Sequence, residues 1–367
     1  MGLSKKLKTW VKARYAGFVK IRNGQDWRGQ ITKAEKKCAD EIPELTGAQK
    51  KEIRKYWKRY GIDVPCFDWH RFFYMRTGLQ RPDFIPKILF NYDVKPFLSD
   101  LRLSPAWSDK SYLDFFLRDV NTPVNIVRSV NGHLLDKDFN EISQSEADEV
   151  MRRFDALVIK PTVFTNTGKG VQLLKPPYRI EDLTDSYKRD FVIQLPLRQH
   201  EEMAKLNESS VNTIRVNSVF IEGEAHVMSC FVKVGQTGEF ADNNGKERYF
   251  IGIKTPEGIF NDYAIDHDMV SYRTIPSGYD FAGQKVPSFE KMCQMVCKAH
   301  KQLAHFGLAF WDVCIDEDGE PCIVEVNLTA PDSAIAQAAC GPFFGDYSDQ
   351  VLDYVRRRNE FLNSSHK

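Results

Sequence analysis

Long apolar runs are missing from this sequence of 367 residues: none reaches the roughly 18 residues of a transmembrane helix. The N-terminal stretch MGLSKKLKTWVKARYAGF lacks the apolar core and small-residue cleavage site of a signal peptide. The eight cysteines form no Cys-x-x-Cys pair and show no zinc-site spacing. We therefore expect a cytoplasmic protein whose thiols are reduced and partly buried.

A large net charge is also missing, but the charges are unevenly distributed. Residues 1–60 hold 17 Lys and Arg against 6 Asp and Glu, a surplus of 11, and the remainder holds 34 against 44. The basic end suggests an anionic partner. Residues 4–22 have apolar side chains at helical spacing between lysines. This pattern fits a helix lying on an anionic membrane surface, or a basic helix packed on its own domain, and the second is slightly favoured. No nucleic-acid module is visible, so no nucleic-acid partner is expected.

Near residue 156 the predicted elements change from mainly helices to mainly strands. Mainly helical segments come first, including 47–60 with Thr46 as N-cap and 108–120 capped by Ser108. Apolar strands follow at 156–161, 171–176 and 189–197, and 211–235 reads as two strands that turn at Glu222–Gly223. Helices are expected again at 288–307, ending at Gly307, and at 347–362. The fold class is therefore α+β, with a helical N-terminal region.

The segment 306–333 contains two apolar strands joined by an acidic turn, and each strand carries a carboxylate. If Asp318–Gly319 forms a two-residue hairpin loop, Asp312 faces Glu325 across the two strands. Asn327 shares their face by strand alternation. The other face is expected to enter a core through four residues: Val313, Ile315, Val324 and Val326.

Two facing carboxylates on a partly buried sheet repel each other unless a cation lies between them. Mg²⁺ binds through one or two carboxylates and takes further oxygens from phosphates. Asp312, Glu325 and Asn327 are therefore candidate metal ligands. The alternative, that they are solvent-facing strand residues, is less favoured because their neighbours are strongly apolar.

Cationic residues lie at two further places in the strands. Lys160 ends an apolar strand, where an ammonium group needs an anion, and Arg215 lies in the middle of VNTIRVNSVF. The loop TNTGKG follows Lys160. Its glycines and Lys169 suit a flexible phosphate-covering loop, although a plain hairpin loop fits equally well. It is not a Walker A loop, which is followed by a helix.

In chain order, the motifs VIKP, TNTGKG, VIQLPLRQH, TIRV, WDV and EVN resemble the ATP-grasp superfamily. With DKSY and ADNNG, they are most similar to the sugar-transfer-associated ATP-grasp proteins found among polysaccharide biosynthesis functions. The resemblance covers about residues 65–350. It implies an ATP-grasp fold, in which two α+β subdomains grip ATP, preceded by the helical region.

The resemblance also implies roles for individual residues. Lys110 and Lys160 would hold the α- and β-phosphates of ATP. A loop would close over them, made of Thr167, Gly168, Lys169 and Gly170. The base and ribose would meet Gln194, Leu195 and Glu201.

The remaining implied roles concern the reaction itself. Mg²⁺ would be held by Asp312, Glu325 and Asn327, and the transferred phosphoryl group would be stabilised by Arg215. Asp242 and Asn243 would lie on the substrate side. Many ATP-grasp ligases carry an arginine two residues before the metal-binding aspartate, where this chain has Phe310, so Arg215 is expected to supply that charge.

The expected domain organisation has five segments. They are a basic helical region (1–100), a first helical or linker part of the core (101–154), a small subdomain with the glycine-rich loop (155–196), a large subdomain with the metal site (197–350), and a C-terminal helix and tail (351–367).

Three functions remain open from the sequence. The first is a carboxylate–amine ligase that works through an acyl-phosphate and attaches an amino acid or related group to a sugar or cell-surface precursor. The second is a kinase acting on a sugar hydroxyl, and the third is a membrane-recruited scaffold without catalysis. Peripheral contact with the inner face of the membrane, through the basic N-terminal helix, is a further expectation.

Overall fold

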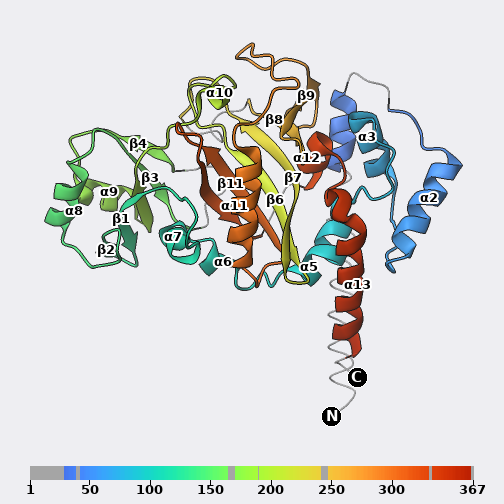
Figure 1. Ribbon diagram of the computed structural model, residues 1–367, viewed down its shortest axis with the longest axis horizontal. Coiled ribbons are helices and arrows are strands. Elements are labelled where there is room, and N and C mark those ends of the chain that lie inside the picture. Colours follow the sequence, from blue (N-terminus) through green and yellow to red (C-terminus); the bar gives the residue numbers. More distant parts are fainter. Residues whose placement is uncertain are drawn as a thin grey trace. The chain divides into compact units, whose positions relative to one another are not determined.

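The computed structural model describes residues 29–38, 42–163, 170–188, 190–240, 247–329 and 333–364 (Figure 1). Residues 4–22, for which a basic helix is expected, lie outside this part. Chain contacts define two compact units: unit 1 is Met1–Ser99, His267–Ser271 and Asp332–Lys367, and unit 2 is Asp100–Asp266 and Tyr272–Pro331. Of the helices described, none has the length and apolarity needed to cross a membrane.

Unit 1 is helical. Residues 29–37 form its first described helix, and the later elements are α2 (Gly47–Lys58), α3 (Asp68–Thr77), α4 (Lys87–Leu89), η1 (Phe90–Val94), α5 (Lys95–Leu98), α12 (Ser333–Cys340), η3 (Gly345–Tyr347) and α13 (Ser348–Ser364). The expected cap at Thr46 is confirmed, because Thr46 and Gln49 form a reciprocal capping box. The aromatic α3 is buried, and its Phe73 stacks on Phe84. Gln337 of α12 bonds both backbone groups of Ile85, which ties the C-terminal segment to the N-terminal helices.

Unit 2 contains two antiparallel sheets. The small sheet has the order β2-β1-β5-β3-β4, and the large sheet has the order β10-β9-β8-β7-β6-β11-β12. The small-sheet strands are β1 (Asn125–Val130), β2 (His133–Leu135), β3 (Leu157–Pro161), β4 (Gln172–Leu174) and β5 (Phe191–Gln194). The large-sheet strands are β6 (Ile214–Ile221), β7 (Glu224–Val234), β8 (Tyr249–Lys254), β9 (Ile259–Ile265), β10 (Ser271–Tyr272), β11 (Leu308–Ile315) and β12 (Pro321–Asn327).

The described helices of unit 2 are α6 (Ser104–Trp107), η2 (Lys110–Tyr112), α7 (Leu113–Phe116), α8 (Gln144–Met151), α9 (Ile180–Tyr187), α10 (Glu201–Ala204) and α11 (Phe289–Lys301). α11 lies across one face of the large sheet (Figure 1). Its residues Met292 and Val296 join a core with apolar residues of β6, β7 and β11, such as Val216, Val232 and Trp311. One face of the large sheet is thereby closed, and the polar residues of these strands alternate onto the other face.

The turn between β6 and β7 is where the sequence places it. Glu222 and Gly223 both have positive φ, 53° and 85°, as a two-residue hairpin turn requires. Two helix boundaries were predicted wrongly. The segment from Ser108 is broken into η2, capped by Asp109, and the one-turn α7, and α11 ends at Lys301 rather than near Gly307. In both cases apolar spacing continues beyond the residues that keep helical hydrogen bonds.

The predicted hairpin loop is also corrected. The loop between β11 and β12 has three residues, 317–319, because Ile315 pairs with Pro321 and the Asp316 amide donates to the Glu320 carbonyl at 2.9 Å. Gly319 has a φ of 80°, the left-handed residue that such a loop needs. The register shifts by one residue between Asp312 and Val313, so the chain carries a β-bulge at Val324.

The expected segment boundaries at 100, 154, 196 and 350 stay a prediction. The structure places one unit boundary between Ser99 and Asp100. The boundary at 154 falls inside the small sheet, since β1 and β2 precede it and β3, β4 and β5 follow it. β1 pairs directly with β5, so residues 125–135 are part of the same sheet as the strand at 191–194.

Candidate active site

Two carboxylates face each other on the open face of the large sheet. β11 lies between β6 and β12, and it pairs Asp312 with Arg215 on one side and with Glu325 on the other. The predicted register of Asp312 and Glu325 is therefore confirmed, although the loop was misjudged, because the bulge at Val324 compensates for the longer loop. The bulge also corrects the predicted core: Ile323 enters it, whereas Val324 is only half-buried and lies outside it.

Asp312 is buried and is held by two cations. The Arg215 guanidinium donates from Nε to Oδ1 at 2.6 Å and from Nη2 to Oδ2 at 3.2 Å. The Lys233 ammonium lies 3.0 Å from Oδ2. Burial by itself raises the pKa of the Asp312 carboxyl, but the charges of Arg215 and Lys233 outweigh it, so the pKa is well below its usual range. Asp312 is therefore ionised at every physiological pH.

Glu325 forms an ion pair with Lys110 and lies near the buried Lys160, and both lysines come from outside the large sheet. The Lys110 ammonium of η2 lies 3.1 Å from Glu325 Oε2. Lys160 of β3 is buried, and burial together with the positive charge of Lys110 lowers its pKa to about 8, partly offset by Glu325. Burial disfavours the charged ammonium most, the positive charge of Lys110 adds to this effect, and the negative charge of Glu325 does not cancel the two. The environment of Lys160 thus favours an added anion.

Lys110 is positioned by contacts to the small sheet. Its backbone amide donates to the Thr162 carbonyl just after β3, at 3.2 Å. The Asp109 side chain caps η2 by accepting from the Ser111 amide. The fully buried Arg128 of β1 donates from Nε to the Ser111 carbonyl at 2.8 Å and forms an ion pair with Asp114. The turn that carries Lys110 is therefore held both by the chain after β3 and by Arg128 of β1. In the sequence alone, Lys110 is an unremarkable lysine.

The charges of this cluster fit a bound magnesium nucleotide. Among the described residues, four cations and two carboxylates meet here, which gives these six side chains a formal surplus of two positive charges. They are Lys110, Lys160, Arg215, Lys233, Asp312 and Glu325. Nucleoside triphosphate with one Mg²⁺ carries about two negative charges. The amide Nδ2 of Asn327 is buried and has no hydrogen-bond acceptor within the described residues, so it is a donor that a bound ligand would satisfy.

A divalent ion at this place depends on phosphate oxygens as well as on the protein. Among the described residues, no group of three His, Cys, Asp or Glu side chains suits a metal ion. Asp312, Glu325 and Asn327 offer two carboxylates and one amide. Mg²⁺ is commonly held by one or two carboxylates together with substrate phosphates. The donor set fits Mg²⁺ that arrives with a nucleotide better than Mg²⁺ alone.

The three residues expected at the base and ribose lie at the end of β5, directly after it, and at the start of α10. Gln194 is buried at the end of the central strand β5, and its Nε2 donates to Asn125 Oδ1 at 2.6 Å. The Leu195 amide is bonded to the Val124 carbonyl at 3.0 Å. Glu201 is exposed at the start of α10, next to His200, whose amide bonds Ile315 at the end of β11. Their roles stay a prediction.

The glycine-rich loop is described only at its end. Gly170 has a φ of 87°, and a Cβ on it would lie 2.9 Å from Pro161 Cγ, so this position requires glycine. The Tyr187 hydroxyl donates to its carbonyl. Thr167, Gly168 and Lys169 lie outside the described residues, as do Asp242 and Asn243.

Lys233 is the site residue that sequence reasoning missed. It lies in β7 two residues after Phe231, which pairs with Arg215, so it shares the face of Arg215. Its side chain is 8% exposed. A signal is present in the motif CFVKVG, where a lysine interrupts an otherwise apolar strand, as Lys160 does in ALVIKP.

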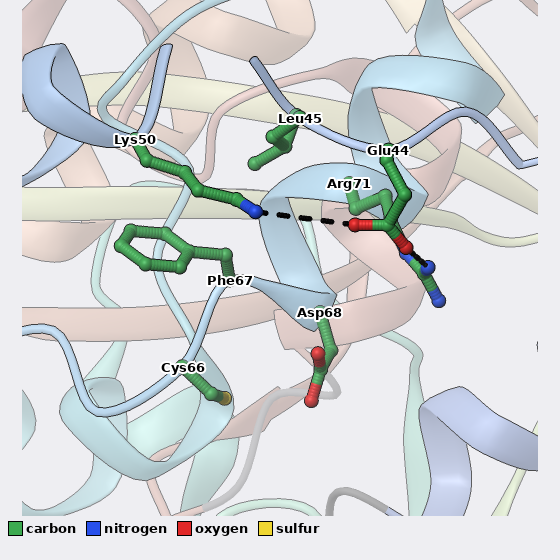
Figure 2. Close-up of a pocket in the computed structure, with 7 residues that line it drawn as sticks. All are labelled: Glu44, Leu45, Lys50, Cys66, Phe67, Asp68 and Arg71. Atoms are coloured by element: carbon green, nitrogen blue, oxygen red, sulfur yellow. Dashed lines mark hydrogen bonds and ion pairs between the residues drawn. The ribbon is translucent and has the colours of Figure 1, made fainter. Parts of the chain in front are cut away.

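A separate cavity of about 240 Å³ lies in unit 1 and contains none of these residues. Figure 2 shows its walls, which carry Glu44, Lys50, Phe67 and Arg71 among others. Glu44 pairs with Arg71 and lies 4.0 Å from Lys50, and Asp68 is the second acidic residue of the wall, so two acidic and two basic side chains balance in charge. Its chemistry does not resemble that of the cluster around Asp312.

The cluster has the chemistry of a class, the nucleotide-dependent phosphoryl-transfer sites, in which cations that suit phosphates lie around carboxylates that suit a divalent ion. Residues 90–346 match the sugar-transfer associated ATP-grasp family, and the chain belongs to this family. The ATP-grasp fold, the binding of ATP and an enzymatic role in the ATP-grasp class follow from this membership, as the sequence motifs implied. No curated protein matches the chain.

Solved structures resemble the chain only distantly. An L-amino acid ligase from Bacillus licheniformis is 17% identical over 63% of this chain and 42% of its own, with a TM-score of 0.36. The ATP-grasp ligase PsnB, complexed with a minimal precursor, is 14% identical over 71% and 63%, with a TM-score of 0.42. VanG D-Ala:D-Ser ligase from Enterococcus faecalis is 11% identical over 68% and 60%, with a TM-score of 0.41. The chain thus spans less than two thirds of each of these three proteins.

Proposed function

We propose that the protein is an ATP- and Mg²⁺-dependent carboxylate–amine ligase. It would attach an amino acid or related group to a sugar or cell-surface polysaccharide precursor. The observation that carries the proposal is the cluster on the open face of the large sheet, in which four cations surround the facing carboxylates Asp312 and Glu325. A buried surplus of positive charge next to metal-binding oxygens suits a polyphosphate substrate.

The residues of the cluster divide the work of phosphoryl transfer. Lys110 and Lys160 neutralise the α- and β-phosphates and orient the triphosphate of the nucleotide. Mg²⁺, when bound through Asp312, Glu325 and Asn327, offsets the charge that develops on the phosphate oxygens. Arg215 stabilises the transferred group.

The reaction proceeds in two displacements. A carboxylate oxygen of the first substrate bonds the terminal phosphorus, and the bond to the bridging oxygen of ADP breaks. The amine of the second substrate then bonds the acyl carbon, phosphate leaves, and the amine gives up one proton. The products are an amide, ADP and phosphate.

A sugar kinase is the second candidate, and Phe310 is the observation that favours it. Phe310 is fully buried two residues before Asp312, at the place where many ATP-grasp ligases carry an arginine. A kinase stops after the first displacement and needs no cation to hold an acyl-phosphate. The same cluster of residues serves either reaction.

The test is ATP consumption with Mg²⁺ in pools of amino acids and sugars, followed by ³¹P NMR. Release of free phosphate that requires both a carboxylate and an amine is expected. A phosphorus signal coupled to a sugar carbon would establish the kinase instead. Binding of ATP without turnover in any pool would support neither reaction and would leave the acceptor unidentified. Glu320→Gln, which changes an exposed residue directly after the hairpin loop, serves as a control that keeps activity, whereas Asp312→Asn is expected to abolish it.

We further infer that the protein works at an anionic surface. The support is the surplus of 11 positive charges in residues 1–60, since polybasic segments are attracted to the anionic cytoplasmic leaflet. Flotation of the full-length protein with liposomes containing an anionic lipid is the measurement. Equal flotation with neutral liposomes, or none at all, would contradict this inference.

A further inference from the structure

The cavity in unit 1 carries two opposite charges on its wall that lie close together without a hydrogen bond between them. The Lys50 ammonium and Glu44 Oε2 are 4.0 Å apart, which is longer than a hydrogen bond (Figure 2). Within the described ranges of the chain, the Lys50 ammonium has no partner other than Glu44, and Glu44 Oε2 has none other than Lys50. Each group can therefore still form a hydrogen bond with a ligand of opposite charge.

Both charged groups are held in place by their neighbours. Arg71 of α3 donates from Nη1 to Glu44 Oε1, and its Nη2 donates to Glu35 Oε1 at 2.5 Å. Lys50 lies in the first turn of α2, where its amide donates to the Thr46 carbonyl at 3.1 Å. The side chains of Lys50 and Glu44 are 36% and 72% exposed, so a ligand can reach both from solvent. Little ordering is left for the ligand to impose, which favours binding.

The wall also has an apolar part. Leu45, which is buried, and Phe67, which is half-buried, both line the cavity. The Arg54 guanidinium lies 4.7 Å from the centre of the Phe67 ring and stabilises its position. The cavity volume of about 240 Å³ is below the roughly 300–1,000 Å³ of pockets that hold drug-sized ligands. The cavity therefore suits one small molecule that has an apolar portion.

The charges of the wall indicate the class of this molecule. A simple anion would be attracted by Lys50 but repelled by Glu44, and a simple cation would be attracted by Glu44 but repelled by Lys50. A molecule with an ammonium and a carboxylate on the same carbon atom can lie antiparallel to the pair, so that each of its charges meets the opposite charge of the wall. An α-amino acid has this arrangement, and its side chain supplies the apolar portion.

We propose that this cavity is a binding site for a free α-amino acid with an apolar side chain. The ammonium of the ligand pairs with Glu44, its carboxylate pairs with Lys50, and its side chain packs on Phe67 and Leu45. The proposal goes beyond the proposed function and does not depend on it, because none of the residues around Asp312 lines this cavity. A pair of surface charges that only neutralise each other would bind no such ligand.

Calorimetry of the full-length protein without nucleotide tests the site, with L-leucine, L-methionine and L-phenylalanine as probes. At least one of them is expected to bind. The methyl ester of that amino acid lacks the carboxylate charge, and its N-acetyl derivative lacks the ammonium. Each derivative is expected to bind about tenfold more weakly or worse, because one charged contact is lost and one charge of the wall is left without a partner.

Variants of the two charged residues assign the binding to this cavity. Lys50→Met and Glu44→Gln are each expected to weaken binding of the amino acid about tenfold. Lys51→Met and Glu52→Gln change exposed neighbours in the same helix and are expected to bind as the wild type does. Urea unfolding of each variant shows whether the fold is kept. If Glu44→Gln is destabilised because Arg71 loses its anion, Lys50→Met and the two derivatives still decide the question.

The outcomes separate this proposal from the proposed function. If none of the three probes binds with a dissociation constant of about 1 mM or tighter, the site is overturned. Binding that Lys50→Met and Glu44→Gln retain at wild-type affinity would assign the amino acid to another place in the protein and also overturn it, while the ligase proposal would stand. Equal binding of the ester and the N-acetyl derivative would contradict recognition by the two charges. Binding through Lys50 and Glu44 in a protein that consumes no ATP would support this site alone.

Discussion

At the scale of single residues, Asp312 is the anion on which the site depends. It is buried, ionised, and contacted by Arg215 and Lys233. Asp312→Asn keeps the size of the side chain but leaves two buried cations without their carboxylate. We expect a loss of roughly 3–5 kcal/mol in the free energy of unfolding, as for other broken buried ion pairs. Urea unfolding monitored by circular dichroism measures it, with Glu320→Gln as the exposed acidic control.

A change of less than about 1 kcal/mol for Asp312→Asn would contradict this account. It would mean that the two cations reach water or other acceptors without cost. Loss of Mg²⁺-dependent nucleotide binding in a variant that remains folded would then still be informative, because it would separate the role of the carboxylate in binding from its role in the fold.

Lys160 gives the site a dependence on pH. Its pKa is lowered to about 8 by burial and by Lys110, so the ammonium loses its proton as the pH rises through about 8. A bound polyphosphate stabilises the protonated form and raises the pKa again. We therefore expect nucleotide binding to take up close to half a proton at pH 8 and to weaken at higher pH.

Calorimetry of ADP with Mg²⁺ at pH 8, in two buffers of different ionisation enthalpy, counts the protons taken up. Lys160→Met is expected to remove this uptake, and so is Lys160→Arg, whose guanidinium stays protonated. Uptake that persists unchanged in both variants would assign the proton to another group. Binding that does not weaken above pH 8 in the wild type would also argue against the assignment.

At the scale of elements, Gly170 ends the glycine-rich loop in a conformation that alanine cannot adopt without strain. Gly132, in the β1–β2 turn of the same sheet, has a similar φ of 84°. A Cβ on Gly132 would have no atom within 4 Å, whereas a Cβ on Gly170 would collide with Pro161. Alanine at either position is expected to cost about 1 kcal/mol for the backbone. Gly170→Ala has the added collision with β3, next to Lys160.

We therefore expect both alanine variants to lose stability, but only Gly170→Ala to lose nucleotide affinity, by about tenfold or more. Thermal unfolding and ADP binding, measured on the two variants side by side, check this. Equal nucleotide affinity in the two variants would show that the end of the loop does not control the phosphate site.

How far the sequence predicts this site depends on the kind of feature. The pairing of Asp312 with Glu325 follows from strand alternation, and the turn at Glu222–Gly223 follows from local preference. The bulge at Val324 does not, because loops of two and of three residues both suit the residues DEDGE. The bulge places Ile323 in the core, a contact that local sequence does not specify. The prediction of the register succeeded because two errors of one residue cancelled.

Contacts between segments far apart in the sequence were the least predictable feature of the site. Lys110 lies in a short turn that looks solvated, and it reaches Glu325 only because Arg128, Asp109 and the chain after β3 fix that turn. The resemblance to a family assigned Lys110 to the site, whereas periodicity alone did not. Lys233 was missed by both routes, since a single lysine in a strand gives no indication of which strand faces it.

At the scale of the whole molecule, each unit contains a fully buried histidine, and this predicts sensitivity to acid. His70 in unit 1 bonds the Pro82 carbonyl, and His300 in unit 2 bonds Ser218 Oγ and the Phe306 carbonyl. Burial lowers the pKa of both to about 4, partly offset by the bonded carbonyl. The unfolded chain therefore binds a proton at each histidine near pH 6.5, which the folded chain takes up only near pH 4.

The sign follows from this difference. Above about pH 6.5 neither state binds the proton, so the free energy of unfolding is unaffected by these histidines. As the pH falls from about 6.5 to 4, the unfolded state binds protons that the folded state does not. The free energy of unfolding therefore falls by up to roughly 3 kcal/mol for each histidine. Urea unfolding at pH 7.5 and pH 5 is expected to give a clear loss for the wild type. His300→Gln, which keeps polar atoms near Ser218 and Phe306 but does not titrate, is expected to lose less between the two pH values. His70→Gln is expected to do the same in unit 1, so a pH dependence unchanged in both variants would mean that other groups control the acid response.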